Sequence, residues 1–296
     1  MKKFSVLVCS YNADYQKLQF TLDSILKQDI DDFEIIICDD GSKENNEQWL
    51  VNYFQLNQFD SYQLVLNSEN KGTVHNLYSG LKRTTGKYVK PIGAGDALCE
   101  RNALQYVYDF MENNSAECVF CDMSCFQYKP GRRIILDNIS IPLKKHEYQG
   151  GSYAERMKEN IIVFNDQIGG ASLFYKTDYF KSLMARFLDK VKYMEDLCQY
   201  YILLEETKIH YIAHSLVAYE IGEGISTLRN KQNNLRMLTD KEAFLNELFA
   251  LFPDDKFVKR RELLERINKK YTNKIIKGLM KCLAEPKWIV FRIARR

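Results

Sequence analysis

The amino-acid sequence predicts an α/β fold in which helices flank both faces of a mostly parallel β-sheet. Within residues 1–115, four short apolar runs alternate with segments whose apolar residues recur at helical spacing. Each apolar run ends in polar residues or glycine. Because open parallel sheets bind ligands at the carboxyl ends of their strands, this pattern also predicts a ligand site.

The individual elements follow from residue spacing and composition. Buried strands are expected at 4–10, 33–38, 62–67 and 88–92, where the sequence is apolar and rich in β-branched residues. Amphipathic helices are expected at 15–28, 74–81 and 104–111. Later in the chain, the sequence predicts a hairpin of 117–128 and 132–139 around Pro130-Gly131, a strand at 169–176 and a helix at 193–206. The second half is therefore more mixed than the first.

The charge of the chain is distributed unevenly. Residues 256–296 carry 14 Lys/Arg against 3 Glu, whereas residues 1–255 carry 28 Lys/Arg against 36 Asp/Glu. Apolar residues lie among the basic ones, which leaves two interpretations: helices packed on the body of the protein with a solvated basic face, or attachment to an anionic membrane surface. The acidic remainder disfavours nucleic acid as a partner. We divide the chain into a domain of residues 1–228 and a helical, basic extension of residues 229–296.

The cellular location is predicted from the start of the chain and from the length of its apolar runs. Met1-Lys2-Lys3 leads directly into a strand pattern, and no run approaches the roughly 20 apolar residues of a membrane span. We therefore expect a cytoplasmic protein, peripheral on the inner face of the cell membrane if its tail attaches there. The eight cysteines are expected to be buried small hydrophobes. Cys118 and Cys121 would point to opposite faces of a strand, which disfavours a metal cluster.

Two candidate sites follow strands. Asp39 and Asp40 precede Gly41-Ser42, and two interpretations are open. They could merely form a tight turn before the next helix, or they could accept hydrogen bonds from a nucleobase or a ribose. Asp96 follows Gly93-Ala94-Gly95. It could be a helix N-cap; alternatively, the small residues would let the backbone approach a diphosphate while Asp96 holds a divalent cation.

A third candidate lies at the start of the predicted helix 193–206. Glu195 and Asp196 would occupy its first turn, where the helix dipole favours negative charge. A carboxylate on a helix that faces a cleft can also act as a general base and take a proton from an acceptor hydroxyl. Both interpretations are open.

Taken together and in order, these segments resemble an inverting glycosyltransferase of family 2 with the GT-A fold. The resemblance covers roughly residues 3–228 and rests on SVLVCSYNAD, FEIIICDDGS, NKG, GKYVKPIGAGDAL, GGASLFYK, YMED and YEIGEGIST. It implies a Rossmann-like sheet and transfer of a sugar from a nucleoside-diphosphate sugar, in many members a UDP-sugar. The implied acceptor is a hydroxyl of a glycan or a lipid-linked molecule, in a setting such as surface polysaccharide biosynthesis.

The resemblance also implies a role for each matching residue. Asp196 matches the catalytic base, with Glu195 as its neighbour. Asp96 matches only the last acid of the family's Asp-x-Asp-Asp motif. The implied cofactor is therefore Mn²⁺ or Mg²⁺ that binds together with the donor, because Mg²⁺ commonly takes one or two carboxylates plus phosphates. The implied nucleotide-sugar site consists of Ser10, Tyr11, Asn12, Asp39, Asp40, Asn70, Gly72 and Gly95.

Two alternative functions are considered. A sugar-nucleotide nucleotidyltransferase would carry a glycine-rich, basic loop after the first strand, and residues 10–14 contain neither glycine nor Lys/Arg. A catalytically impaired GT-A-like module that binds a membrane or a partner is suggested by the missing acids at positions 93 and 95.

Overall fold

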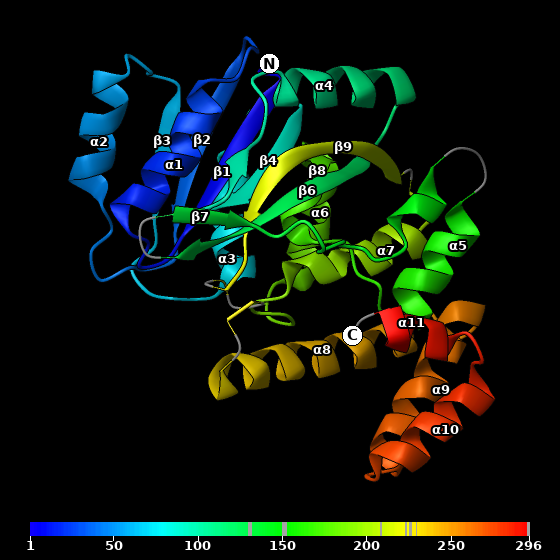
Figure 1. Ribbon diagram of the computed structural model, residues 1–296. Coiled ribbons are helices and arrows are strands. Elements are labelled where there is room, and N and C mark those ends of the chain that lie inside the picture. Colours follow the sequence, from blue (N-terminus) through cyan, green and yellow to red (C-terminus); the bar gives the residue numbers. More distant parts are fainter. Residues whose placement is uncertain are drawn as a thin grey trace.

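The computed structural model describes residues 1–129, 132–149, 153–207, 209–222, 224, 227–228 and 230–294. Nine strands of these residues form one twisted sheet in the order β3-β2-β1-β4-β8-β6-β9-β5, with β7 paired to β6 (Figure 1). The strands are β1 Phe4–Ser10, β2 Phe33–Asp39, β3 Tyr62–Leu66, β4 Tyr88–Gly93, β5 Ala97–Leu98, β6 Cys118–Lys129, β7 Arg132–Ile135, β8 Leu173–Lys176 and β9 Ile209–Glu220.

Helices cover both faces of this sheet, as predicted. They are α1 Tyr15–Leu26, α2 Glu47–Leu56, α3 Thr73–Leu81, α4 Ala103–Asn114, α5 Ala154–Lys158, α6 Thr177–Phe187, α7 Cys198–Leu204, α8 Lys231–Leu251, α9 Lys256–Lys270, α10 Lys274–Ala284 and α11 Trp288–Ala294. Short turns are η1 Lys145–Tyr148, η2 Glu159–Val163, η3 Gly170–Ser172 and η4 Glu195–Leu197. None of the described helices combines the length and the apolar character that crossing a membrane requires.

The first four strands form the predicted parallel sheet. β1 pairs in parallel with β2 and β4, and β2 pairs in parallel with β3. Because neighbouring residues of a strand face opposite sides, Leu7 joins one hydrophobic cluster, with α3 and α6, while Val6 and Val8 join the other, with α1, α2 and α4. Burial on both faces explains why β1 and β2 are largely apolar, whereas β3 at the edge of the sheet is only half-buried.

The second half of the sheet is mixed. β8 pairs antiparallel with both β4 and β6, whereas β9 runs parallel to β6. The predicted hairpin is present, with β6 and β7 antiparallel, although its Pro130-Gly131 turn lies outside the described residues. Its second strand ends at Ile135 and not at residue 139, because Asp137 and Asn138, both turn formers, form a turn.

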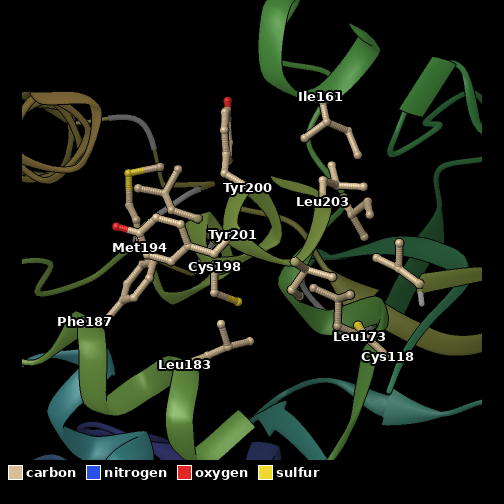
Figure 2. Packing of buried hydrophobic residues seen from close by; sticks show 14 of the residues in the cluster. Cys118, Ile161, Leu173, Leu183, Phe187, Met194, Cys198, Tyr200, Tyr201 and Leu203 are labelled. Atoms are coloured by element: carbon tan, nitrogen blue, oxygen red, sulfur yellow. The ribbon is translucent and has the colours of Figure 1, made fainter. Parts of the chain in front are cut away.

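Helix α7 is enclosed by aromatic and aliphatic side chains on nearly every side (Figure 2). Tyr201 packs edge to face on Phe187 of α6, with ring centroids 5.5 Å apart, and also contacts Phe244 of α8 at 5.5 Å. Phe257 and Leu264 of α9 belong to the same hydrophobic cluster. Helices α8 and α9 therefore share a core with the sheet. The domain boundary at residue 228 stays a prediction.

Candidate functional site

A cavity of about 470 Å³ opens at the carboxyl ends of β1 and β4. Cys9, next to the end of β1, and Gly93, the last residue of β4, are paired in the sheet and form part of the cavity wall. Asp96, Glu195 and Asp196 also line it. Carboxyl groups that lie 100 residues apart in the sequence thus face one space, at the edge of the sheet where ligand binding is expected.

Hydrogen bonds to its backbone hold the loop that carries Asp96 in place. The Thr21 hydroxyl of α1 accepts a hydrogen bond from the Gly95 N–H at 2.9 Å and donates one to the Asp96 carbonyl at 2.7 Å. Asp96 Oδ1 accepts the N–H of Glu220 at 2.9 Å. Since α4 begins after Asn102, Asp96 is not its N-cap, and that interpretation is wrong.

The small residues before Asp96 give its carboxylate room. A Cβ at position 93 would lie 3.2 Å from Asp96 Oδ2. A Cβ at position 95, where φ is +109°, would lie 2.5 Å from Glu220 Oε2 and would meet a backbone conformation that disfavours other residues. Gly95 itself is not among the described residues that line the cavity, so its contact with the donor remains a prediction.

Two buried charged residues beside Asp96 were missed from the sequence. Glu220 at the end of β9 is paired with Lys17 of α1, with 2.8 Å between Lys17 Nζ and Glu220 Oε1. Lys90 lies in the central strand β4 and is fully buried; its ammonium donates to the carbonyls of Ala171 and Leu173. Both could have been suspected as charged residues within otherwise apolar strands. Burial raises the pKa of Asp96 to about 7, while the Glu220 N–H and Lys90 act in the opposite direction.

Glu195 and Asp196 lie in the short turn η4, directly before α7. The sequence predicts an α-helix over 193–206 with both acids in its first turn, but the α-helix spans only Cys198–Leu204. The acids lie in a tighter turn, in which the Leu197 N–H donates to the Met194 carbonyl three residues earlier at 3.2 Å. The Gln199 side chain accepts the Ile168 N–H at 2.8 Å and donates to the Asp196 carbonyl at 2.8 Å. These bonds join the turn to the neighbouring loop. The absence of a side chain at Gly170 lets this loop approach η4 closely, since a Cβ at position 170 would lie 3.2 Å from Glu195 Oε1.

Both carboxyl groups of this turn have raised pKa values. Burial in the protein is the main cause for each. For Glu195, the nearby charge of Asp196 raises the pKa further. Two carboxylates at one place do not ionise independently, and a carboxylate whose pKa is shifted towards neutral pH is a competent general base.

The polar residues at the ends of β1 and β2 form a network next to the cavity. The Asp39 carboxylate accepts the N–H and the hydroxyl of Ser42, at 2.7 and 2.6 Å. The Asp40 carboxylate accepts the N–H groups of Lys71 and Gly72, both at 2.9 Å. Neither aspartate is among the described residues that line the cavity. Their contacts with a nucleotide remain predictions.

The remaining predicted nucleotide residues surround this network. Ser10 is buried opposite Asp39 in the β1–β2 register. Tyr11 and Asn12 follow it and are exposed; the Asn12 N–H donates to Ser42 Oγ at 2.6 Å. Asn70 is also exposed, one residue before the Lys71 amide that Asp40 binds. An exposed aromatic ring such as that of Tyr11 is suited to stacking on a base.

Comparison with known proteins shows the family to which the chain belongs. The family model for Glycosyl transferase family 2 matches residues 5–183. The chain belongs to glycosyl transferase family 2. This membership rules against the nucleotidyltransferase alternative. The family match ends before Glu195 and Asp196, so the structure and not the match brings them to the cavity.

Related proteins agree with this assignment. Poly(ribitol-phosphate) β-N-acetylglucosaminyltransferase TarP of Staphylococcus aureus is 26% identical over 289 residues, which cover 94% of this chain and 80% of TarP. S. aureus TarS, solved with UDP-GlcNAc, superimposes with a TM-score of 0.58 at 16% identity, over 98% of this chain and 81% of that one. The mannosyltransferase PcManGT of Pyrobaculum calidifontis, solved with GDP-Man and Mn²⁺, gives 0.56 at 13% identity, over 99% and 85%. This family 2 chain is thus a glycosyltransferase with the GT-A fold.

Few side chains in the described part of this glycosyltransferase are placed to coordinate a divalent cation. No group of three His, Cys, Asp or Glu side chains in the described part of the chain could hold a metal ion. Asp96 lines the cavity and is the acid for which the sequence predicts a metal-binding role. The residues present therefore fit a cation that takes most of its ligands from phosphates and water, as Mg²⁺ commonly does. Cys118, Cys121 and Cys125 are buried thiols in β6, as predicted, but the prediction that all eight cysteines are buried is wrong: Cys99 is exposed, and Cys9 and Cys282 are partly buried.

Proposed function

We propose that this enzyme transfers a sugar, with inversion of configuration, from a UDP-sugar to a hydroxyl group of a glycan or a lipid-linked polymer. One observation carries the proposal: Asp96 and the Glu195–Asp196 pair face the same cavity at the carboxyl edge of the sheet. N-acetylglucosamine is the first candidate sugar, since TarP is an N-acetylglucosaminyltransferase and TarS was solved with UDP-GlcNAc. The expected setting is the synthesis of a surface polysaccharide.

The proposed reaction is a direct displacement. Asp196 accepts the proton of the acceptor hydroxyl as its oxygen forms a bond to the anomeric carbon. The bond from that carbon to the phosphate oxygen breaks on the opposite face, and UDP leaves with the electron pair. Asp96 would hold a divalent cation, Mn²⁺ or Mg²⁺, that supplies positive charge to the departing diphosphate.

The environment distinguishes the two acids of η4. The charge of Asp196 raises the pKa of Glu195, which fits ionisation of Asp196 before Glu195. Asp196 would then be the base, and a protonated Glu195 beside it could donate a hydrogen bond to the acceptor or the donor sugar. Cys9, a further wall residue, is a thiol whose raised pKa keeps it neutral.

Binding of a panel of donors tests the sugar-nucleotide assignment. We expect UDP-GlcNAc with Mn²⁺ at about 100 times its Kd to add about 2.7 kcal/mol of stability, a rise in Tm of about 4 °C. UDP-GlcNAc without Mn²⁺ should raise Tm by less, because no cation then joins the diphosphate of the donor to the Asp96 carboxylate. The measurement is thermal unfolding with UDP-GlcNAc, UDP-Glc, UDP-Gal and GDP-Man, each with and without Mn²⁺. Stabilisation by GDP-Man but by no UDP-sugar would contradict the proposed donor.

We further propose that α10 attaches the enzyme to the anionic inner face of the cell membrane. Helix α9 buries Phe257, Val258 and Leu264 against the body, whereas α10 has no buried residue. Ile275, Leu279 and Leu283 recur every four residues along α10 and are 75%, 60% and 77% exposed. Lys274, Lys277 and Lys281 lie on the same helix. An exposed apolar stripe beside lysines fits an anionic lipid surface, where each basic residue contributes about 1 kcal/mol.

Substitution of the α10 stripe tests this attachment. We expect Ile275→Ser/Leu279→Ser/Leu283→Ser to lower partitioning onto phosphatidylglycerol vesicles at least tenfold, since burial of one such side chain is worth about 1.5–3 kcal/mol. Tm should change little because the three side chains are exposed. The control is Leu56→Ser on α2, which is 83% exposed and should sediment with vesicles like the wild type. Equal vesicle binding of the triple variant would refute the proposal. Deletion of residues 256–296 is a poorer test, because it also removes the buried side chains of α9.

A further inference from the structure

The carboxylate of Asp240, a buried residue of α8, binds the segment directly before the η4 acids. Its Oδ2 accepts the backbone N–H groups of Lys192 at 3.1 Å, Tyr193 at 2.5 Å and Met194 at 3.1 Å. The next two residues are Glu195 and Asp196. One charged oxygen thus determines the path of three consecutive residues that lead into the catalytic turn. Hydrogen bonds to an ionised acceptor are stronger than neutral ones.

Helix α8 holds Asp240 firmly enough for this role. Phe244 and Leu248 follow Asp240 at intervals of four residues, so all three project from one face of the helix. Both apolar side chains are buried in the core that also surrounds α7. The carboxylate is therefore attached to a rigid element, although it lies more than 40 residues beyond the acids it supports.

The same segment also contacts the predicted nucleotide side of the site. The carbonyl of Lys192 accepts the N–H of Val74 at 3.1 Å, at the start of α3. A Cβ on Gly72 would lie 2.4 Å from Lys192 Cγ, which shows how closely the two loops pack. Since Asp40 binds the Gly72 N–H, hydrogen bonds run from the end of β2 through residues 72–74 and 192 to Asp240.

We propose that Asp240 is a positioning residue: by binding the backbone of residues 192–194 it sets the place of the Asp196 carboxylate relative to the donor site. The inference rests on the proposed function, in which Asp196 is the base. Displacement of a reacting group by about 1 Å can lower a rate about 100-fold, so a support of this kind affects turnover more than binding. The role is carried by a helix outside the family match at 5–183.

Asp240 also acts on the site through its charge. The titratable groups near Glu195 are Asp196 in the same turn, Asp240 of α8, the Cys9 thiol of β1, the Cys198 thiol of α7 and the Tyr175 hydroxyl of β8. Both aspartates raise the pKa of Glu195. Removal of the Asp240 charge therefore lowers the pKa of Glu195. Because Glu195 acts in its protonated form, the alkaline limb of the profile of kcat against pH, where Glu195 loses its proton, should move to lower pH as a result.

The experiment compares Asp240→Ala, Asp240→Asn, Asp196→Asn and the control Glu242→Gln, which removes an exposed charge from the same helix. We expect Asp240→Ala to lower kcat about 100-fold with donor KM within about threefold of wild type. Asp240→Asn keeps one acceptor oxygen, so its kcat should recover to within about tenfold, with the alkaline limb of the pH profile shifted to lower pH. Glu242→Gln should match the wild type in both respects.

The possible failures are distinguishable. Wild-type kcat in Asp240→Ala, while Asp196→Asn is inactive, would overturn the positioning role and leave the base in place. If Asp240→Ala does not fold, Asp240→Asn decides: a lowered Tm with wild-type kcat and an unshifted pH profile would show a merely structural role and overturn the inference. Full activity of Asp196→Asn would remove the proposed base and the inference with it.

Discussion

Asp196→Asn is expected to lower kcat by about 10²–10⁴-fold while the donor still binds with near wild-type affinity. The range is that of a lost general base, and asparagine keeps the size of the side chain without its ability to accept the proton. The carbonyl of residue 196 that Gln199 binds is retained, so η4 should keep its path. The measurements are initial rates of sugar transfer and the Kd of UDP-GlcNAc by calorimetry.

The matched control for this variant is Glu195→Gln. If Glu195 is the protonated member of the pair, an amide replaces a neutral acid, and kcat should fall by less than about tenfold. Near-normal transfer by Asp196→Asn, together with a large loss in Glu195→Gln, would exchange the two roles. Normal transfer by both variants would exclude this turn as the source of the base.

Asp96→Asn is expected to lower kcat/KM by about 100-fold or more and to remove most of the response to Mn²⁺. The amide can still accept the Glu220 N–H through its oxygen, so the loop should stay in place. It is a much poorer metal ligand than a carboxylate, and charge stabilisation by a bound metal is worth several kcal/mol. The measurement is kcat/KM for the donor as Mn²⁺ is titrated from EDTA-treated enzyme.

The control for Asp96 is its neighbour Glu220. Glu220→Gln removes a buried acid that is paired with Lys17 and is not among the described residues of the cavity wall. It should keep the dependence on Mn²⁺, even if Tm falls because the ion pair between Lys17 and Glu220 is lost. An unchanged Mn²⁺ titration in Asp96→Asn, or a lost one in Glu220→Gln alone, would show that Asp96 is not the metal ligand.

The strands of the first half could be predicted because local pattern and tertiary environment agree there. β1 and β2 are buried on both faces, so their central residues, 6–9 and 35–38, are all apolar and indicate a strand by themselves. The mixed half was harder to order. The position of β8 between β4 and β6 depends on two antiparallel ladders between distant segments. No local pattern encodes which strands become neighbours.

For the acidic residues of the candidate site, too, only part could be predicted from the sequence. Asp39, Asp96, Glu195 and Asp196 could be singled out because each stands where an apolar run stops or a helix starts. What each carboxylate binds could not be foreseen: Asp39 holds Ser42, and Asp40 holds the amides of residues 71 and 72. Glu220, Lys90 and Asp240 went unnoticed. The first two stand within apolar strand patterns and could have been suspected, but only the tertiary structure shows that they are buried and what they bind.

By itself, then, the sequence determined the class of the fold, the edge of the sheet that carries the ligand site and the acids that qualify as catalytic groups. Periodicity and turn composition are local properties of the chain, and the carboxyl ends of parallel strands must share an edge. Only the tertiary structure decided which acids face one cavity and what orients them. The bond from Asp240 to residues 192–194 joins a C-terminal helix to a loop 46 to 48 residues earlier, and such a contact exists only once the core around Phe244 has formed.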